Sequence, residues 1–145
     1  MAYLKEIKVS FQRKRVDDDL LNKPVKSSKQ VYTLFKEMEN ELKEKVVVLH
    51  LGPDLKILSY EVAAIWTWIW TTINPREIFR TAVAGLAHSL VIVHNHPLWK
   101  PKPSKEDKNA CKALVEFSEA VQIKLNDFII IWEDWYFSFD ENWMI

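Results

Sequence analysis

The chain has 145 residues, 48% of them hydrophobic, which suits one globular domain that buries roughly two-thirds of its unfolded surface. Its 20 basic and 20 acidic residues cancel, so it lacks the overall positive charge that favours nucleic-acid binding. Cys111 is the single cysteine, which excludes an intrachain disulfide and predicts an inert thiol in a cytoplasmic protein. We expect no membrane association, because no apolar stretch reaches transmembrane length and residues 1–9 lack the apolar core of a signal peptide.

Residues 1–27 are predicted to be an N-terminal extension, with one strand at residues 6–12. Lysine and arginine are frequent in residues 5–15, but three aspartates follow at residues 17–19. This combination is more typical of a solvated arm than of a nucleic-acid-binding one. Residues 28–145 are predicted to be the main domain, because regular helix and strand patterns begin there.

The main domain alternates between helix and strand patterns. Asn74 and Pro75 are typical of a helix N-cap and first helical position, and Gly52-Pro53-Asp54 is typical of a hairpin turn. We expect helices at residues 29–42, 75–87 and 107–121, and strands at residues 46–51, 55–63, 65–72, 90–94, 127–132 and 135–139. This order predicts an α/β (α+β) fold with a mixed, mostly antiparallel sheet flanked by helices.

An HNHP motif at residues 94–97 directly follows the apolar stretch of residues 91–93, which predicts a buried strand. Side chains alternate between the two faces of a strand, so His94 and His96 point the same way and Asn95 points the other way. Two imidazole groups therefore converge on one point at the end of this strand.

Asp107 lies three residues after Ser104, where two prolines and a polar run indicate a loop that enters a helix. Its carboxylate is then in the first helical turn and can face the end of the histidine strand. His94, His96 and Asp107 offer two nitrogens and one oxygen, which leaves a fourth tetrahedral position open. This layout is typical of catalytic zinc, so we predict one Zn²⁺ per chain.

Each half of this pattern also has an ordinary structural interpretation. A histidine at a strand end is usually a surface or satisfied core residue, and Ser-x-x-Asp is typical of a helix capping box. The complete pattern is His-x-His, seven residues, Ser, two residues and Asp, in a strand–loop–helix context. This combined constraint favours metal binding.

The surrounding VIVHNHPLWKPKPSKED resembles the signature of the RadC-like proteins, a bacterial group within the JAMM (MPN+) metallohydrolases. The similarity extends over residues 27–140. It includes SSKQVYTLFKEM, EKVVVLHLGPDLKILSYE, INPREIFRTAVA and LNDFIIIWEDWYFSF, which look like the family's first helix, first hairpin, next helix and last strands. The resemblance implies the three-layer JAMM/MPN architecture, which is similar to that of cytidine deaminases.

The resemblance also implies which residues carry the chemistry. The family's upstream glutamate falls on Glu44 at the start of EKVVVLHL, although glutamates at positions 41, 61 and 77 also precede the histidines. Glu44 would take a proton from zinc-activated water and pass it to a leaving amine, and Ser104 would donate a hydrogen bond to the oxyanion. The implied reaction is hydrolysis of a peptide or isopeptide bond in a peptide or protein substrate.

Two other classes of function remain open on the sequence. One is an accessory module of DNA metabolism or DNA repair with a non-catalytic metal site. The other is an interaction protein, because Trp66, Trp68 and Trp70 share a face of the strand predicted at residues 65–72. Such a stripe favours sheet packing or a homo-oligomer interface over a substrate groove. Trp99, on the loop after HNHP, is expected to shape or block access to the metal.

Overall fold

The computed structural model of the chain describes residues 1–66, 73–97 and 102–145. Its elements in chain order are α1 (Asp18–Asn22), α2 (Ser28–Phe35), the 3₁₀ helix η1 (Lys36–Asn40), β1 (Glu44–Leu51), β2 (Ile57–Trp66), α3 (Pro75–Ala84), β3 (Ser89–Asn95), α4 (Lys105–Val121), β4 (Lys124–Trp132) and β5 (Trp135–Ser138). The described strands form one sheet in the order β2-β1-β3-β4-β5. Only the pair β3–β4 is parallel, so the predicted mixed, mostly antiparallel sheet is confirmed.

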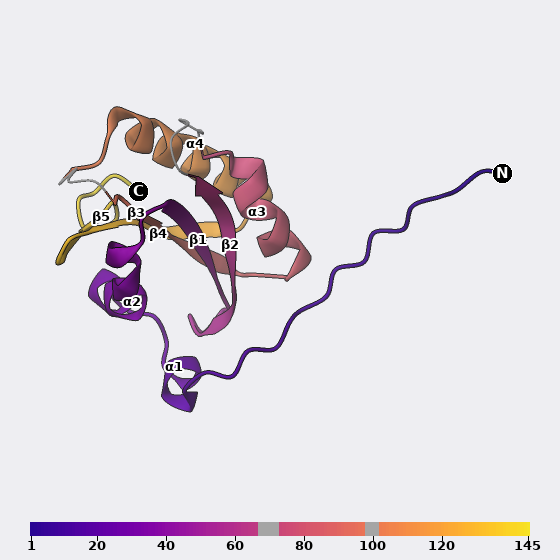
Figure 1. Cartoon of the computed structure of the whole chain (residues 1–145), viewed down its shortest axis with the longest axis horizontal. Helices are drawn as coiled ribbons and strands as arrows, with labels where there is room; N and C mark the ends of the chain where they lie inside the picture. Colours follow the sequence, from indigo (N-terminus) through magenta and orange to yellow (C-terminus); the bar gives the residue numbers. More distant parts are fainter. Residues whose placement is uncertain (67–72, 98–101) are drawn as a thin grey trace.

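Helices cover both faces of this sheet, which gives three layers (Figure 1). α3 and α4 enclose one hydrophobic core, and α2 and η1 enclose the other. Alternate residues of β1 supply both cores: Val46 and Val48 belong to the first, and Val47 and Leu49 belong to the second. β1 is thus buried on both faces, which explains its continuous apolar sequence.

Helix capping explains where the predicted helices begin. The side chain of Asn74 accepts a hydrogen bond from the backbone N–H of Arg76 at 3.0 Å, and Pro75 is the first residue of α3. The first predicted helix is wrong in its C-terminal part, because the α-helix ends at Phe35 and a 3₁₀ helix continues to Asn40. α1 was not predicted from the sequence, and its N-cap Asp17 lies in the acidic stretch that was interpreted as part of a solvated arm.

Two strand predictions are wrong. Residues 6–12 pair with no described strand, because alternation of apolar residues forms a strand only where a partner supplies backbone hydrogen bonds. The break expected between residues 63 and 65 is a β-bulge: Val47 pairs with Val62 and Val46 pairs with Ala64, so β2 continues through it to Trp66.

Several sequence predictions concern residues that the structure does not describe. The rest of the strand predicted at residues 65–72, with Trp68 and Trp70, lies outside the described residues, and so does Trp99. The tryptophan stripe and its role in self-association therefore stay predictions. Among the helices of the described ranges, none is both long and apolar enough to span a bilayer.

Candidate metal centre

The two histidines lie side by side where β3 leaves the sheet. Their side chains are almost completely buried, with 4% of His94 and 7% of His96 exposed, and the ring centroids are 4.8 Å apart. The backbone N–H of His96 donates to the carbonyl of Ile131 at 2.8 Å. This hydrogen bond extends the β3–β4 pairing past the last residue of β3 and keeps both rings on one face of the sheet.

Asp107 approaches the histidines from the first turn of α4. Its carboxylate is 5% exposed, with Oδ1 at 3.5 Å from Nδ1 of His94 and Oδ2 at 3.3 Å from Nε2 of His96. Ligand atoms from the three residues all lie within 4.8 Å of one another. The structure therefore brings together the three residues predicted as metal ligands.

Ser104 is the N-cap of α4 and forms a capping box with Asp107. Its Oγ accepts from the backbone N–H of Asp107 at 3.0 Å, and its backbone N–H donates to Oδ2 of Asp107 at 2.7 Å. The hydroxyl also donates to the same Oδ2 at 2.7 Å. The capping box and the ligand group thus coexist, because one carboxylate caps the helix and faces the histidines.

Burial and hydrogen bonding compete in setting the protonation of this cluster. Burial raises the pKa of Asp107, but hydrogen bonds with His94, His96 and Ser104 outweigh it and hold that pKa well below its ordinary value. Burial lowers the pKa of His94, but the carboxylates of Asp107 and Glu44 outweigh it and raise that pKa. The cluster therefore combines a buried carboxylate anion with basic nitrogens, which is the charge distribution that a divalent cation stabilises.

The donor set fits zinc. Imidazole nitrogens bind Zn²⁺ at about 2.0–2.1 Å and carboxylate oxygens at about 2.0–2.2 Å, which places neighbouring ligand atoms a little over 3 Å apart in a tetrahedral site. The contacts of Asp107 with the histidines, at 3.3 and 3.5 Å, are close to this separation. His94, His96 and Asp107 could therefore hold the ion with small side-chain adjustments.

Glu44 is the glutamate at this centre. It is the first residue of β1, and its Oε2 lies 3.6 Å from Nε2 of His94 with 36% of its side chain exposed. The other three candidates are engaged elsewhere: Glu41 pairs with Lys45, and both Glu61 and Glu77 pair with Arg80. A partly exposed carboxylate beside a buried ligand group is suitably placed for proton transfer.

Asn95 has a role that the sequence analysis missed. Its side chain is completely buried on the opposite face of β3, where Oδ1 accepts from the backbone N–H of Lys45 at 2.6 Å. Its Nδ2 donates to the carbonyls of Met38 and Lys43, each at 3.1 Å. Asn95 therefore ties the chain on both sides of Glu44 to the strand that carries the histidines. A polar residue at a predicted buried position is the signal that could have indicated this role.

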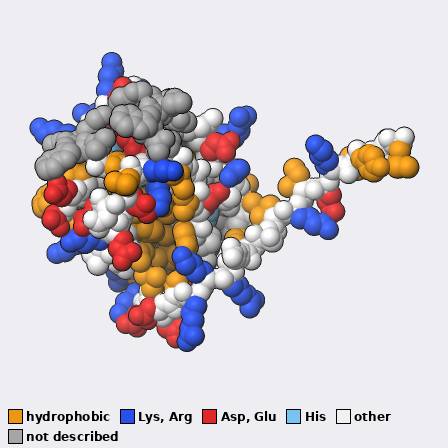
Figure 2. Space-filling view, viewed as in Figure 1, with side chains coloured by type: hydrophobic (Ala, Val, Ile, Leu, Met, Phe, Trp, Pro, Cys, Tyr) orange, Lys and Arg blue, Asp and Glu red, His pale blue; other side chains and the backbone are white. Residues whose placement is uncertain are grey.

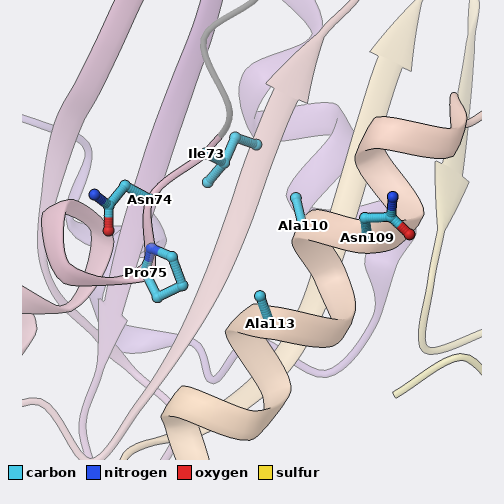
Figure 3. Close-up of a pocket in the computed structure, with 6 residues that line it drawn as sticks. All are labelled: Ile73, Asn74, Pro75, Asn109, Ala110 and Ala113. Atoms are coloured by element: carbon cyan, nitrogen blue, oxygen red, sulfur yellow. The ribbon is translucent and has the colours of Figure 1, made fainter.

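A pocket of about 270 Å³ lies beside the first turns of α4 (Figure 3). It is lined by Asn109, Ala110 and Ala113 of α4 and, across from them, by Ile73, Asn74 and Pro75 at the start of α3. Ala110 is one helical turn beyond Asp107 along α4, and none of the three candidate ligands lines the pocket. Its lining carries no charged side chain, which suits a neutral group.

Comparison with known proteins places the chain in a family. A family model described as the RadC-like JAB domain matches residues 25–144. The chain belongs to the RadC-like JAB domain family. This result confirms the relationship to JAMM-type proteins that the sequence motifs predicted.

Curated relatives of this RadC-like JAB domain carry the name UPF0758 protein. The chain is 34% identical over 126 residues to a UPF0758 protein of Pelodictyon phaeoclathratiforme, which covers 86% of this chain and 57% of that protein. Identity is 36% over 123 residues to the protein of Chlorobaculum tepidum, with coverages of 84% and 55%. For the protein of Thermotoga maritima it is 35% over 131 residues, with coverages of 89% and 59%. The chain thus spans a little over half the length of these curated relatives, whose names state no activity.

Proposed function

We propose that this RadC-like JAB domain is a zinc-dependent hydrolase of amide bonds, acting on a peptide or isopeptide bond of a peptide or protein substrate. The convergence of Glu44 on the buried group of His94, His96 and Asp107 supports this proposal most strongly. A structural zinc site normally uses four protein ligands, whereas a catalytic site uses three and leaves one position for water or substrate.

The chain supplies a ligand set and a proton carrier. Zinc bound by two imidazoles and a carboxylate supplies Lewis acidity and lowers the pKa of water toward neutrality. Glu44 accepts the proton of the attacking water and returns it to the leaving amine, for which its partial exposure and its distance of 3.6 Å from His94 are suitable.

Ser104 has a more constrained role than its position in the motif suggests. Its single hydroxyl hydrogen is donated to Oδ2 of Asp107, so donation to an oxyanion requires rotation about the Cβ–Oγ bond. This rotation leaves the helix cap in place, because Oγ still accepts from the backbone N–H of Asp107. Ser104 therefore holds Asp107 until substrate binds and then stabilises the charge that develops on the substrate oxygen.

Metal content is the first test of this function. Elemental mass spectrometry of protein purified without a metal-affinity tag should give about one zinc per chain, with loss of zinc in His96→Ala and Asp107→Ala. The wild type should then hydrolyse members of a panel of isopeptide-linked and linear peptides, and neither variant should. Absence of zinc even after reconstitution contradicts the proposal. Zinc binding without turnover on the panel instead favours a non-catalytic module, such as an accessory protein of DNA metabolism.

A further inference from the structure

β2 leaves large apolar side chains uncovered on one face of the sheet. It is the last strand at its edge among the described residues, because it pairs only with β1. The exposed fraction is 54% for Leu58, 44% for Tyr60, 44% for Val62 and 54% for Ile65, and we call these four residues the β2 patch. Figure 2 shows apolar side chains gathered in a band over this part of the sheet. Contiguous exposed apolar surface of this kind marks an interaction site.

The β2 patch lies on the same face of the sheet as the second hydrophobic core, next to the part that α2 and η1 cover. Tyr60 pairs with Leu49, and Val62 pairs with Val47, and both partners are buried in that core. Directly opposite residues in paired strands lie on the same face of a sheet, so the patch and the core share one face. α2 and η1 pack mainly over β4 at the far side of this face. α2 and η1 therefore leave the edge of the sheet at β2 open, and of the remaining helices α1 and α3 contact this strand.

The N-terminal arm, which we define as residues 1–17, carries a complementary pattern. Ile7, Val9 and Phe11 alternate with polar residues, and their exposed fractions are 91%, 61% and 66%. Tyr3 and Leu4 are also exposed, at 86% and 99%. Figure 1 shows the arm as an extended segment that leaves the body of the molecule. The arm thus has the alternating composition of a β-strand, but it pairs with no strand among the described residues.

The base of the arm already lies against the β2 patch. Nζ of Lys14 donates a hydrogen bond to the hydroxyl of Tyr60 at 3.1 Å and lies 5.7 Å from the centre of its ring. Further out, the ring of Phe11 lies beside Gly85 at the end of α3, and from there the arm points away from its own β2. The apolar residues N-terminal to Phe11 are therefore exposed in the single chain.

We propose that two copies of this chain associate by exchanging their arms, so that residues 3–11 of each copy lie along the β2 patch of the other as an added strand. An extended segment of this length spans roughly 30 Å, which is about the length of β2. An exchange of identical segments gives a closed twofold dimer with two equal contacts. Buried aromatic rings contribute about 150–250 Å² each, so two arms with the rings of Tyr3 and Phe11 and the aliphatic side chains of Ile7 and Val9 apiece reach the roughly 1,200 Å² of a specific interface.

The association state of the full chain tests this proposal. Sedimentation velocity over a concentration series should show a reversible dimer, and both Ile7→Lys/Val9→Lys on the arm and Val62→Lys on the patch should weaken it at least tenfold. Ser10→Lys/Gln12→Lys is the matched control, because it adds the same two charges on the polar face of the arm and should leave the dimer intact. Circular dichroism and thermal unfolding verify that each variant is folded.

Mixing the arm variant with the patch variant distinguishes exchange from other modes of association. The mixed dimer retains one contact between a wild-type arm and a wild-type patch, so it should form more tightly than either variant alone. A chain that is monomeric at all concentrations overturns the proposal, as does a dimer that is insensitive to the arm substitutions. Protection of residues 3–11 from hydrogen exchange in a monomer also overturns it, because the arm would then dock on its own β2.

Discussion

The side-chain oxygen of Asn95 accepts a hydrogen bond from the backbone N–H of Lys45 at 2.6 Å, and this contact joins β3 to the start of β1 across fifty positions of sequence. The same side chain donates to two carbonyls of the preceding segment, those of Met38 and Lys43. A buried amide with three backbone partners fixes the position at which Glu44 enters the sheet.

Replacement of Asn95 by Ala should therefore destabilise the fold. It leaves one N–H and two carbonyls without their partner; one of these three hydrogen bonds is buried and two are partly buried, and a fully buried unsatisfied group costs about 1–3 kcal/mol. We expect a loss of about 2–4 kcal/mol in the free energy of unfolding, measured by urea denaturation. Asn126→Ala is the control, because Asn126 makes one part-buried hydrogen bond to Ser89, and it should cost about 1 kcal/mol or less. Equal losses in the two variants would refute the special role of Asn95.

Glu44→Gln should separate metal binding from turnover. The amide keeps the size of the side chain but cannot accept a proton, so hydrolysis should fall by about 10²-fold or more while zinc content stays unchanged. Glu41→Gln is the matched control, since Glu41 forms its ion pair with Lys45 and not with a histidine. Steady-state kinetics on any substrate found in the panel give the comparison. Loss of activity in both variants, or in neither, would assign the proton transfer to another group.

Zinc should stabilise the folded chain through its three ligands. A ligand that binds only the folded state at 100 times its dissociation constant adds about 2.7 kcal/mol to the free energy of unfolding. The midpoint of thermal unfolding should accordingly rise with zinc concentration and fall after chelation. His96→Ala tests specificity, because it removes a buried ligand and should abolish the response. A zinc-dependent rise of equal size in this variant would show that the ion acts elsewhere.

His50 should make the fold less stable at mildly acidic pH. Burial lowers its pKa below the ordinary value of 6.5, although Glu61 opposes the shift, and its ring contacts Ser59 at 2.8 Å. The folded state therefore binds fewer protons than the unfolded state as pH falls through this region, so stability present above pH 6.5 is lost below it. Urea midpoints between pH 7.5 and 5 should fall more steeply for wild type than for His50→Gln. Parallel profiles would exclude His50 as the source.

Cys111 should be unreactive in the folded protein. Burial among the first hydrophobic core raises the pKa of its thiol to about 12, and Asp127 adds to the shift. Because the thiolate is the reactive form, labelling by a thiol reagent at pH 8 should be slow and should accelerate on unfolding in urea. Rapid stoichiometric labelling of the native chain would contradict the burial of this residue and the interpretation of the thiol as inert.

The ligand group could be predicted from sequence because its geometry is local. His94 and His96 share one strand, and Asp107 follows within the same strand–loop–helix unit, so periodicity and helix capping suffice to place them. The contacts of Asn95 could not be derived in this way, because its partners lie in η1, the following loop and β1. Long-range partners of a buried amide depend on the packing of elements that periodicity does not define.

The same difference between local patterns and long-range packing explains the errors in the predicted strands. The hairpin of β1 and β2 was predicted from alternation and turn residues, but the bulge at Ala63 looked like a break because it inverts the alternation without ending the strand. Residues 6–12 show the opposite case: apolar and polar residues alternate regularly, but the segment pairs with no described strand. A pattern along the chain indicates which conformation a segment favours, and only tertiary structure supplies the partner.

The site residues come from two separate parts of the chain, so a local disturbance can displace some of them and leave the others in place. The three residues that could hold the metal come from residues 94–107, whereas Glu44, the base in the proposed function, comes from a strand that must pair with β3 before its carboxylate reaches His94. A disturbance at the junction of η1 and β1 would displace the base and leave the ligands together. If the proposed function holds, damage there would yield a folded protein that binds zinc but does not catalyse hydrolysis, so metal content alone would be a poor measure of its activity.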